Sequence, residues 1–123
     1  MRTGERSNKR EIGSIQEERA GEYLKKQGMY ILEQNFRCRN GEIDIIGRDQ
    51  GYLVFVEVKY RSSSKAGHPA EAVNYQKQRK ICRTADFYRY IHKIGADVNI
   101  RYDVVALTQE EIFWYQNAFQ HIY

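Results

Sequence analysis

The sequence predicts an α/β protein with a mixed five-stranded sheet flanked by helices, in the order α-β-β-β-α-β-β. Two stretches carry apolar residues at helical spacing, and five shorter stretches are rich in β-branched and aromatic residues. The passage from the strand around Val54, through the second helix, to the strand around Val104 requires a parallel, right-handed crossover. These three observations favour one layered domain over an all-β or all-α fold.

Composition agrees with a folded chain that prefers anionic partners. The 123 residues are 41% hydrophobic and 29% charged, with a net charge of +4. Cys38 and Cys82 lack metal-ligand spacing, so we expect two reduced thiols. No apolar run reaches the ~18 residues that a membrane span needs, and the first residues lack the apolar centre of a signal peptide. We therefore expect a cytoplasmic protein without a membrane partner.

The N-terminal part divides into an arm and a helix. Residues 1–10 are basic and lack apolar periodicity, which predicts a flexible basic arm ahead of a single domain over residues 11–123. Helical spacing predicts a first helix over about residues 11–27, with an apolar set formed by Ile12, Ile15, Ala20, Tyr23 and Leu24. Glu17 lies on the side that turns toward this set. It is either a boundary residue reaching water or a functional carboxylate.

The next stretches predict a three-stranded antiparallel meander. Residues 30–39 form one strand, and residues 41–60 form a hairpin that turns at Asp49-Gln50-Gly51. A loop over residues 61–68 precedes a second helix that begins at Pro69 and ends near Lys93. Residues 99–107 and a short stretch at residues 112–115 complete the five strands.

The second helix combines an apolar stripe with a strong positive charge. The stripe that we expect to point inward consists of Val73, Ile81, Ala85, Tyr88 and Ile91. Lys77 falls within this row, so it either extends to water at the edge of the core or meets an anionic ligand beside the sheet. The predicted nucleic-acid contacts are Lys77, Gln76, Arg79, Lys80 and, after the hairpin, Arg61.

The hairpin brings two carboxylates face to face. In the register whose opposite residue numbers sum to 101, one face is apolar and carries Ile43, Ile45 and Gly47 opposite Val58, Val56 and Val54. The other face sets Asp44 against Glu57 and Glu42 against Lys59. A shift by two residues satisfies the same apolar pattern. Like charges directly opposite are destabilising unless a raised pKa, a cation or a metal relieves them.

Either the Lys59 ammonium group or a divalent ion could relieve the repulsion between Asp44 and Glu57. Mg²⁺ or Mn²⁺ takes carboxylate, carbonyl and water oxygens, so Asp44, Glu57 and the Val58 carbonyl are the predicted ligands for one or two ions. Lys59, on the same face as Glu57, is placed to stabilise developing negative charge. Glu17 could hold a second ion. The competing interpretation is a solvated charge ladder in which Lys59 pairs with Glu42.

The same residues carry a family resemblance. GEIDIIGRD followed by LVFVEVKYR resembles the core of the PD-(D/E)XK nuclease superfamily, or restriction-endonuclease-like fold, which includes archaeal Holliday-junction resolvases. From about Ile12 the chain resembles more closely the YraN-like family, uncharacterised bacterial proteins assigned to that fold, in the pieces EERAGEYLKKQG, NFRCRNGEIDIIG, FVEVKYR, GHPAEAVNYQKQRKI, RYDVV and NAF. The resemblance implies catalytic positions at Asp44, Glu57, Lys59 and Glu17. Gln16 stands where that family usually has Gly.

Two functions follow as expectations. The first is a Mg²⁺-dependent endonuclease that hydrolyses phosphodiester bonds of DNA, with structure-selective cleavage as one form. The second is a non-catalytic nucleic-acid-binding or partner-binding protein that retains the nuclease fold. Nucleic acid, with DNA favoured over RNA, is the expected partner, and branched substrates would suit a homodimer.

Overall fold

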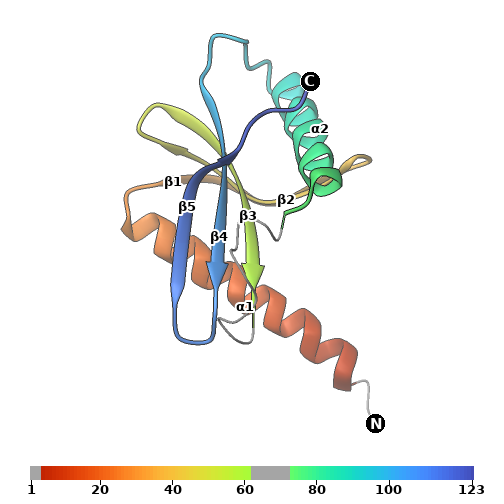
Figure 1. Ribbon diagram of the computed structural model, residues 1–123, viewed down its shortest axis with the longest axis vertical. Coiled ribbons are helices and arrows are strands. Elements are labelled where there is room, and N and C mark those ends of the chain that lie inside the picture. Colours follow the sequence, from red (N-terminus) through yellow and green to blue (C-terminus); the bar gives the residue numbers. More distant parts are fainter. Residues whose placement is uncertain (1–3, 62–72) are drawn as a thin grey trace.

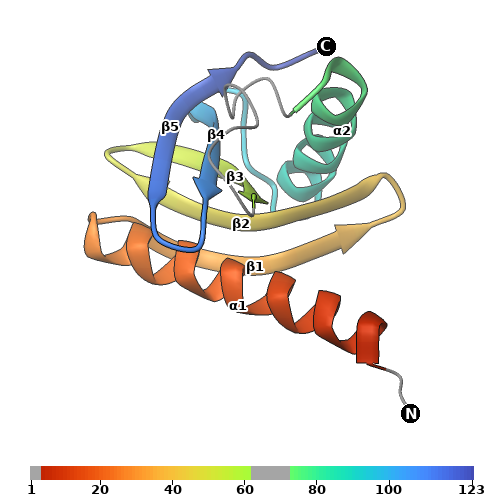
Figure 2. The same cartoon turned by 60° about the horizontal axis from the view of Figure 1, so that its bottom comes forward.

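The protein is a five-stranded mixed sheet with one helix on each face. The computed structural model describes the backbone of residues 4–61 and 73–123 and the side chains of residues 12–61 and 73–123. In chain order the elements are α1 (Gly4–Lys26), β1 (Tyr30–Cys38), β2 (Gly41–Asp49), β3 (Tyr52–Tyr60), α2 (Tyr75–Ile91), β4 (Ile100–Leu107) and β5 (Ile112–Phe119) (Figure 1). Figure 2 shows α1 against the sheet beside β1, and α2 on the opposite side. The predicted order of elements is confirmed.

The strands lie in sequence order, from β1 to β5. The β1–β2, β2–β3 and β4–β5 pairs are antiparallel, whereas β3 and β4 are parallel and are joined through α2. The register of the hairpin is the predicted one, with Ile45 opposite Val56 and Asp49 opposite Tyr52. The structure thereby excludes the alternative shifted by two residues.

Several boundaries differ from the sequence prediction. The first helix begins at Gly4 rather than near Glu11, so the predicted limit of the arm falls inside α1. The second helix begins at Tyr75 rather than at Pro69, because the Asn74 side chain caps it by accepting a hydrogen bond from the Lys77 amide at 2.9 Å. Pro69 and the predicted loop over residues 62–68 lie outside the described residues. The last strand continues to Phe119, beyond the predicted short segment.

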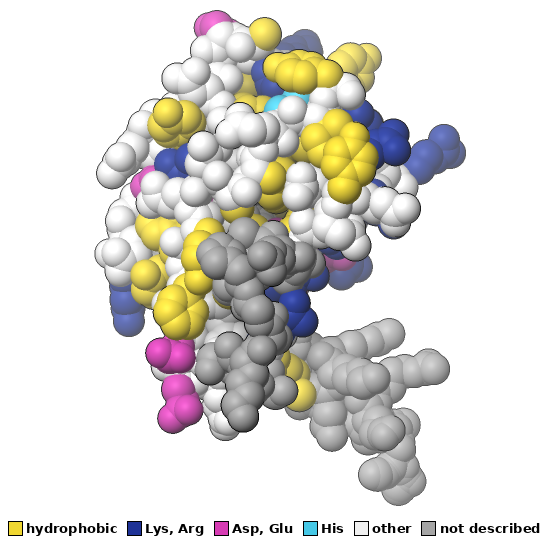
Figure 3. Space-filling model, viewed as in Figure 1, with side chains coloured by type: hydrophobic (Ala, Val, Ile, Leu, Met, Phe, Trp, Pro, Cys, Tyr) yellow, Lys and Arg dark blue, Asp and Glu magenta, His cyan; other side chains and the backbone are white. Residues whose placement is uncertain are grey.

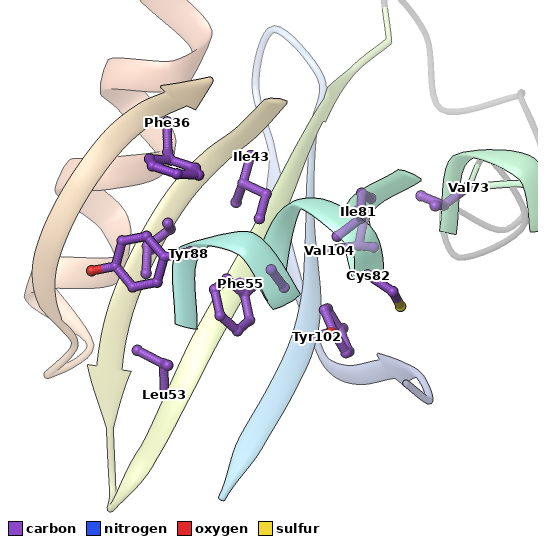
Figure 4. Packing of buried hydrophobic residues seen from close by; sticks show 12 residues of the cluster. Phe36, Ile43, Leu53, Phe55, Val73, Ile81, Cys82, Tyr88, Tyr102 and Val104 are labelled. Carbon is purple, nitrogen blue, oxygen red and sulfur yellow. The ribbon is translucent and has the colours of Figure 1, made fainter. Parts of the chain in front are cut away.

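Two separate apolar clusters cover the two faces of the sheet. Figure 4 shows the cluster beneath α2, in which Phe55, Tyr88 and Tyr102 pack together. The cluster beneath α1 includes Ala20, Leu24, Ile45, Val54 and Val56. Burying both faces of β3 explains why its sequence is continuously apolar from Leu53 to Val56.

The predicted apolar faces need three corrections. Ile12 and Ile15 are exposed, and Gln16 is buried with Ala20 and Leu24 instead, because the N-terminal half of α1 projects beyond the sheet (Figures 1 and 2). Ile91 is exposed at the end of α2, and Val73 is buried but precedes the helix. Ile43 and Ile45 do not share a face, since Ile43 packs in the cluster beneath α2 and Ile45 in the cluster beneath α1.

The C-terminal segment fixes α2 on the sheet. The Arg83 guanidinium donates a hydrogen bond to the Ile122 carbonyl, and the Ile122 amide donates to the Cys82 sulfur at 3.4 Å. The Tyr102 hydroxyl lies 2.6 Å from Nδ1 of His121. These contacts hold α2, and thus Lys77 on its first turn, in place over β3.

A buried ionic network links β4 to residues of β2 and β5. Asp103 is 0% exposed and accepts hydrogen bonds from the Arg101 side chain, the Trp114 indole and the Asn117 amide at 2.8–2.9 Å. Arg101 also pairs with Asp49 at 2.9 Å. Three strands, β2, β4 and β5, are therefore linked through a single arginine and its two carboxylates.

Replacing Asp103 with alanine should lower the free energy of unfolding by about 3–5 kcal/mol, because a buried arginine loses one of its two carboxylates. Urea unfolding followed by circular dichroism measures this change. Asp97→Ala, which removes an exposed carboxylate, is the matched control and should change stability by less than about 0.5 kcal/mol. Equal effects of the two variants would show that the network does not stabilise the sheet.

Candidate metal and phosphodiester site

The candidate site is built where β2 and β3 separate. The pairing of these strands ends at Ile45 and Val56. One residue further along β2, the Asp44 side chain reaches toward β3, where its Oδ2 accepts a hydrogen bond from the Val58 amide at 2.8 Å. A side-chain carboxylate thus takes the place of a backbone carbonyl as acceptor. Where the Asp44 side chain accepts this hydrogen bond, the side chains of β2 no longer alternate regularly between the two faces of the sheet. Ile43 and Ile45 therefore lie on different faces.

The neighbouring strand is irregular at the same level. In β1, Asn35 lies between the residues paired with Ile45 and Ile43, and it has a positive φ of 57°. Its side chain forms a hydrogen bond with Glu17 of α1. A left-handed asparagine is an uncommon conformation that costs conformational energy. Here it connects the helix-one glutamate to the sheet.

Three carboxylates meet on the α1 side of this opening. Oxygen atoms of Glu17, Glu42 and Asp44 all lie within 4.8 Å of one another. The Arg37 Nε is 3.6 Å from Glu42, but both side chains reach solvent, so this pair compensates little of the negative charge. Burial, and next the charge of Glu42, raise the pKa of Glu17.

Glu57 joins the cluster from the other side. Its negative charge acts on Asp44 and raises the pKa of that carboxyl group, and the Glu57 side chain itself is only 6% exposed. The Lys59 Nζ is 3.5 Å from Glu57 Oε2, and the Lys77 Nζ, reaching over from α2, is 3.7 Å from the same oxygen. The competing interpretation, in which Lys59 pairs with Glu42, is therefore wrong, since Lys59 pairs with Glu57 on its own strand and Glu42 with Arg37.

Asp44 is the group that both halves of the cluster share. Burial in the first place, and then the negative charge of Glu57, raise the pKa of its carboxyl group to about 8. The Val58 amide opposes this shift by favouring the ionised form. Near neutral pH the Asp44 carboxyl group therefore holds a proton, which reduces its repulsion with Glu57. A divalent cation could reduce the same repulsion instead.

The donor set fits a hard divalent ion. All four acids offer carboxylate oxygens, the ligand type that Mg²⁺ and Mn²⁺ prefer. In the part of the chain that the structure describes, no histidine or cysteine belongs to the cluster of Glu17, Glu42 and Asp44. Asp44 with Glu57 could hold one ion, and Asp44 with Glu17 and Glu42 a second. The Val58 amide is engaged with Asp44, and a ligand role for its carbonyl stays a prediction.

The predicted nucleic-acid contacts occupy two places. Lys77 lies at the acidic cluster, whereas Gln76, Arg79 and Lys80 line a shallow depression of about 320 Å³ together with Asn40 and Arg83. Figure 3 shows Lys and Arg side chains gathered along the side of the molecule where α2 lies. Arg61 is exposed just past the end of β3, and its amide bonds to the Leu107 carbonyl at 2.8 Å.

Sequence reasoning did not place Glu42 in the site. Its position two residues before Asp44 on β2 was a usable signal, because alternate residues of a strand share a side. The interruption at Asp44, which the sequence did not reveal, decides the direction in which the Glu42 side chain points. Asn35 was missed as well, since nothing in its neighbourhood predicts a positive φ.

This fold and site define a class. A mixed five-stranded sheet with two helices, in the order α-β-β-β-α-β-β, is consistent with the restriction-endonuclease-like fold. Within that class the chain belongs to the family described as "Uncharacterised protein family UPF0102", whose model matches residues 16–107. This result confirms the predicted YraN-like membership.

Relatives from distant bacteria match most of the chain. A UPF0102 protein of Lachnoclostridium phytofermentans is 48% identical over 112 residues, which cover 91% of this chain and 95% of the relative. One of Acetivibrio thermocellus is 48% identical over 111 residues, with 89% and 85% covered, and one of Persephonella marina is 43% identical over 107 residues, with 87% and 91% covered. None of these names states an activity. Within the described residues, no helix is both long and apolar enough to span a membrane.

The raised pKa of Asp44 predicts how stability changes with pH. Between pH 4 and 8 the folded protein keeps a proton that the unfolded chain has released, so this group's contribution to stability is lost as pH rises toward 8. Asp44→Asn has no carboxyl group to titrate at this position, so it does not lose this part of its stability as pH rises. In metal-free buffer the variant should become more stable than wild type as pH rises from 4 to 8, by on the order of 2–4 kcal/mol at the upper end.

Urea unfolding at several pH values measures the difference. Glu22→Gln, which changes an exposed acid of α1, is the control and should follow the wild-type curve throughout. A constant offset between Asp44→Asn and wild type over this range would contradict the raised pKa.

Proposed function

We propose that this protein is a Mg²⁺- or Mn²⁺-dependent endonuclease that hydrolyses phosphodiester bonds of DNA. The observation that carries the proposal is the meeting of the Glu17, Glu42 and Asp44 carboxylates where the pairing of β2 and β3 ends, with the charge of a fourth acid, Glu57, acting on Asp44. A basic depression on α2 accompanies this acidic group. Two ammonium groups accompany the four acids, and both contact Glu57. The remaining negative charge on the α1 side suits a divalent cation.

Each residue has a role that its position supports. The Val58 amide orients the Asp44 carboxylate toward the other acids, and Asn35 orients Glu17. Lys59, with its side chain 31% exposed, reaches both Glu57 and solvent, where it can stabilise negative charge that develops on a phosphodiester. A divalent ion held by the carboxylates would supply Lewis acidity, which activates water for attack and neutralises phosphate charge.

The ion requirement gives the first test. Mn²⁺ titrated into metal-free wild-type protein should bind, and Asp44→Asn should weaken binding by more than about 100-fold, since even outer-shell changes cost 10–100-fold. Glu42→Gln should also weaken binding, which tests the carboxylate that only the structure revealed. Isothermal titration calorimetry measures all three, with Glu22→Gln as the control. Equal Mn²⁺ affinity of wild type and Asp44→Asn would refute the site.

Cleavage is tested on the same proteins. Wild type with Mg²⁺ or Mn²⁺ should cut at least one of branched, flapped, single-stranded and supercoiled DNA, and Asp44→Asn should cut none of them. Failure of wild type on every substrate, despite metal binding, would count against hydrolysis and in favour of the second candidate function.

The second candidate is a nucleic-acid-binding protein that retains the nuclease fold, and the depression on α2 favours it. Arg79→Ala and Lys80→Ala should each weaken DNA binding and reduce the slope of log affinity against log salt by about 1, because each removes one phosphate contact. Fluorescence anisotropy at several salt concentrations measures this slope. Lys93→Ala, which removes an exposed lysine beyond the end of α2, is the control. Unchanged slopes would exclude the depression as the binding surface.

A further inference from the structure

Glu57 already has two cations on one oxygen. Its Oε2 lies 3.5 Å from the Lys59 Nζ and 3.7 Å from the Lys77 Nζ. The carboxylate is nearly buried, so water screens its attraction to the two ammonium groups less than it would screen a fully exposed ion pair. A divalent ion that uses Glu57 as a ligand must therefore compete with these lysines.

The Lys59 and Lys77 side chains differ in how easily they can move away from Glu57. Lys59 is on β3, two residues from Glu57, and its side chain follows the same face of the strand. Lys77 comes from a different element, the first turn of α2, and its side chain is 41% exposed. The Asn74 cap holds the Lys77 amide, while the long side chain can turn without moving the helix.

Lys77 contacts Glu57 and also belongs to the same helix as the residues that line the basic depression. Its neighbours Gln76 and Lys80 line that depression, and Arg79 extends it along α2. A phosphate backbone bound there would bring negative charge to the side of Lys77 that faces away from Glu57. The Lys77 ammonium would then have a second anionic partner within the reach of its side chain.

We infer that Lys77 couples the binding of a polynucleotide to the binding of the metal. In the free protein Lys77 pairs with Glu57 and disfavours the ion. When a phosphate of the nucleic acid lies along α2, Lys77 turns to that phosphate, and Glu57 becomes available as a ligand. This coupling rests on the proposed function, because it assumes that the acids bind a divalent ion and that α2 binds a nucleic acid.

The coupling is reciprocal. If DNA raises the affinity for the ion, the ion must raise the affinity for DNA by the same factor. The metal site is then incomplete until a substrate is present. Such an arrangement keeps the hydrolytic centre inactive while no nucleic acid is bound.

The experiment measures Mn²⁺ affinity rather than cleavage. Full-length wild type and Lys77→Gln are titrated with Mn²⁺, followed by electron paramagnetic resonance, with and without a short DNA duplex whose integrity is checked afterwards on a gel. In wild type the duplex should tighten Mn²⁺ binding by about 5–150-fold. In Lys77→Gln the ion should bind more tightly than in wild type without DNA, and the effect of the duplex should largely disappear.

Two further variants separate this role from a structural one. Lys77→Arg keeps the charge and should restore part of the coupling, whereas Lys77→Met should repeat the result of Lys77→Gln. Arg79→Gln should weaken binding of the duplex but leave the Mn²⁺ affinity of the free protein unchanged. Circular dichroism and melting temperature confirm that each variant is folded.

The outcomes distinguish the two proposals. If Mn²⁺ binds wild type through Asp44 but Lys77→Gln has the same affinity and the same response to DNA, the coupling is wrong and the metal site stands. Mn²⁺ affinity of wild type that does not change with the duplex also overturns the coupling. If Mn²⁺ fails to bind wild type with or without the duplex, both proposals fail.

Discussion

The hydrogen bond from the Val58 amide to the Asp44 carboxylate is the interaction on which the arrangement of the site depends. It occurs where the β2–β3 ladder ends, and it replaces a backbone acceptor with a side-chain acceptor. Because an unpaired amide in the interior is costly, the carboxylate is held between the strands. Asp44 can then reach Glu57 on one side of the sheet and Glu17 and Glu42 on the other.

The two helices complete the site from opposite faces. Glu17 comes from α1, and Lys77 comes from the start of α2, so neither half of the cluster belongs to the hairpin alone. The core keeps these helices in position through separate apolar clusters on each face of β3. A strand that is buried on both sides is a rigid support for charged residues at its end, where Glu57 and Lys59 follow the apolar run.

Packing and electrostatics act against each other at this point. The sheet buries Asp44 close to Glu57, which raises the pKa of Asp44, whereas the Val58 amide favours the ionised form of Asp44 and the two lysines contact Glu57. The Arg101 network shows the opposite solution in the same sheet. There, Asp49 and Asp103 share one buried arginine, and Asp103 also accepts hydrogen bonds from Trp114 and Asn117, so both carboxylates have fixed partners within the protein. The contrast explains why the acidic cluster, and not the Arg101 network, is the candidate functional site.

The sequence by itself determined the order of the elements and limited the hairpin to registers that keep its apolar pattern, because alternation along a strand is a local pattern. The structure decided between the register that sets Asp44 near Glu57 and the one shifted by two residues. The sequence did not determine where α2 begins, since that depends on the Asn74 cap, nor the exposure of Ile12 and Ile15, since that depends on how far α1 extends beyond the sheet. Only the tertiary structure brought Glu42 into the acidic cluster and turned Lys77 toward Glu57. Both follow from contacts between segments distant in the chain and from a strand irregularity at Asp44, and neither leaves a periodic signal in the sequence.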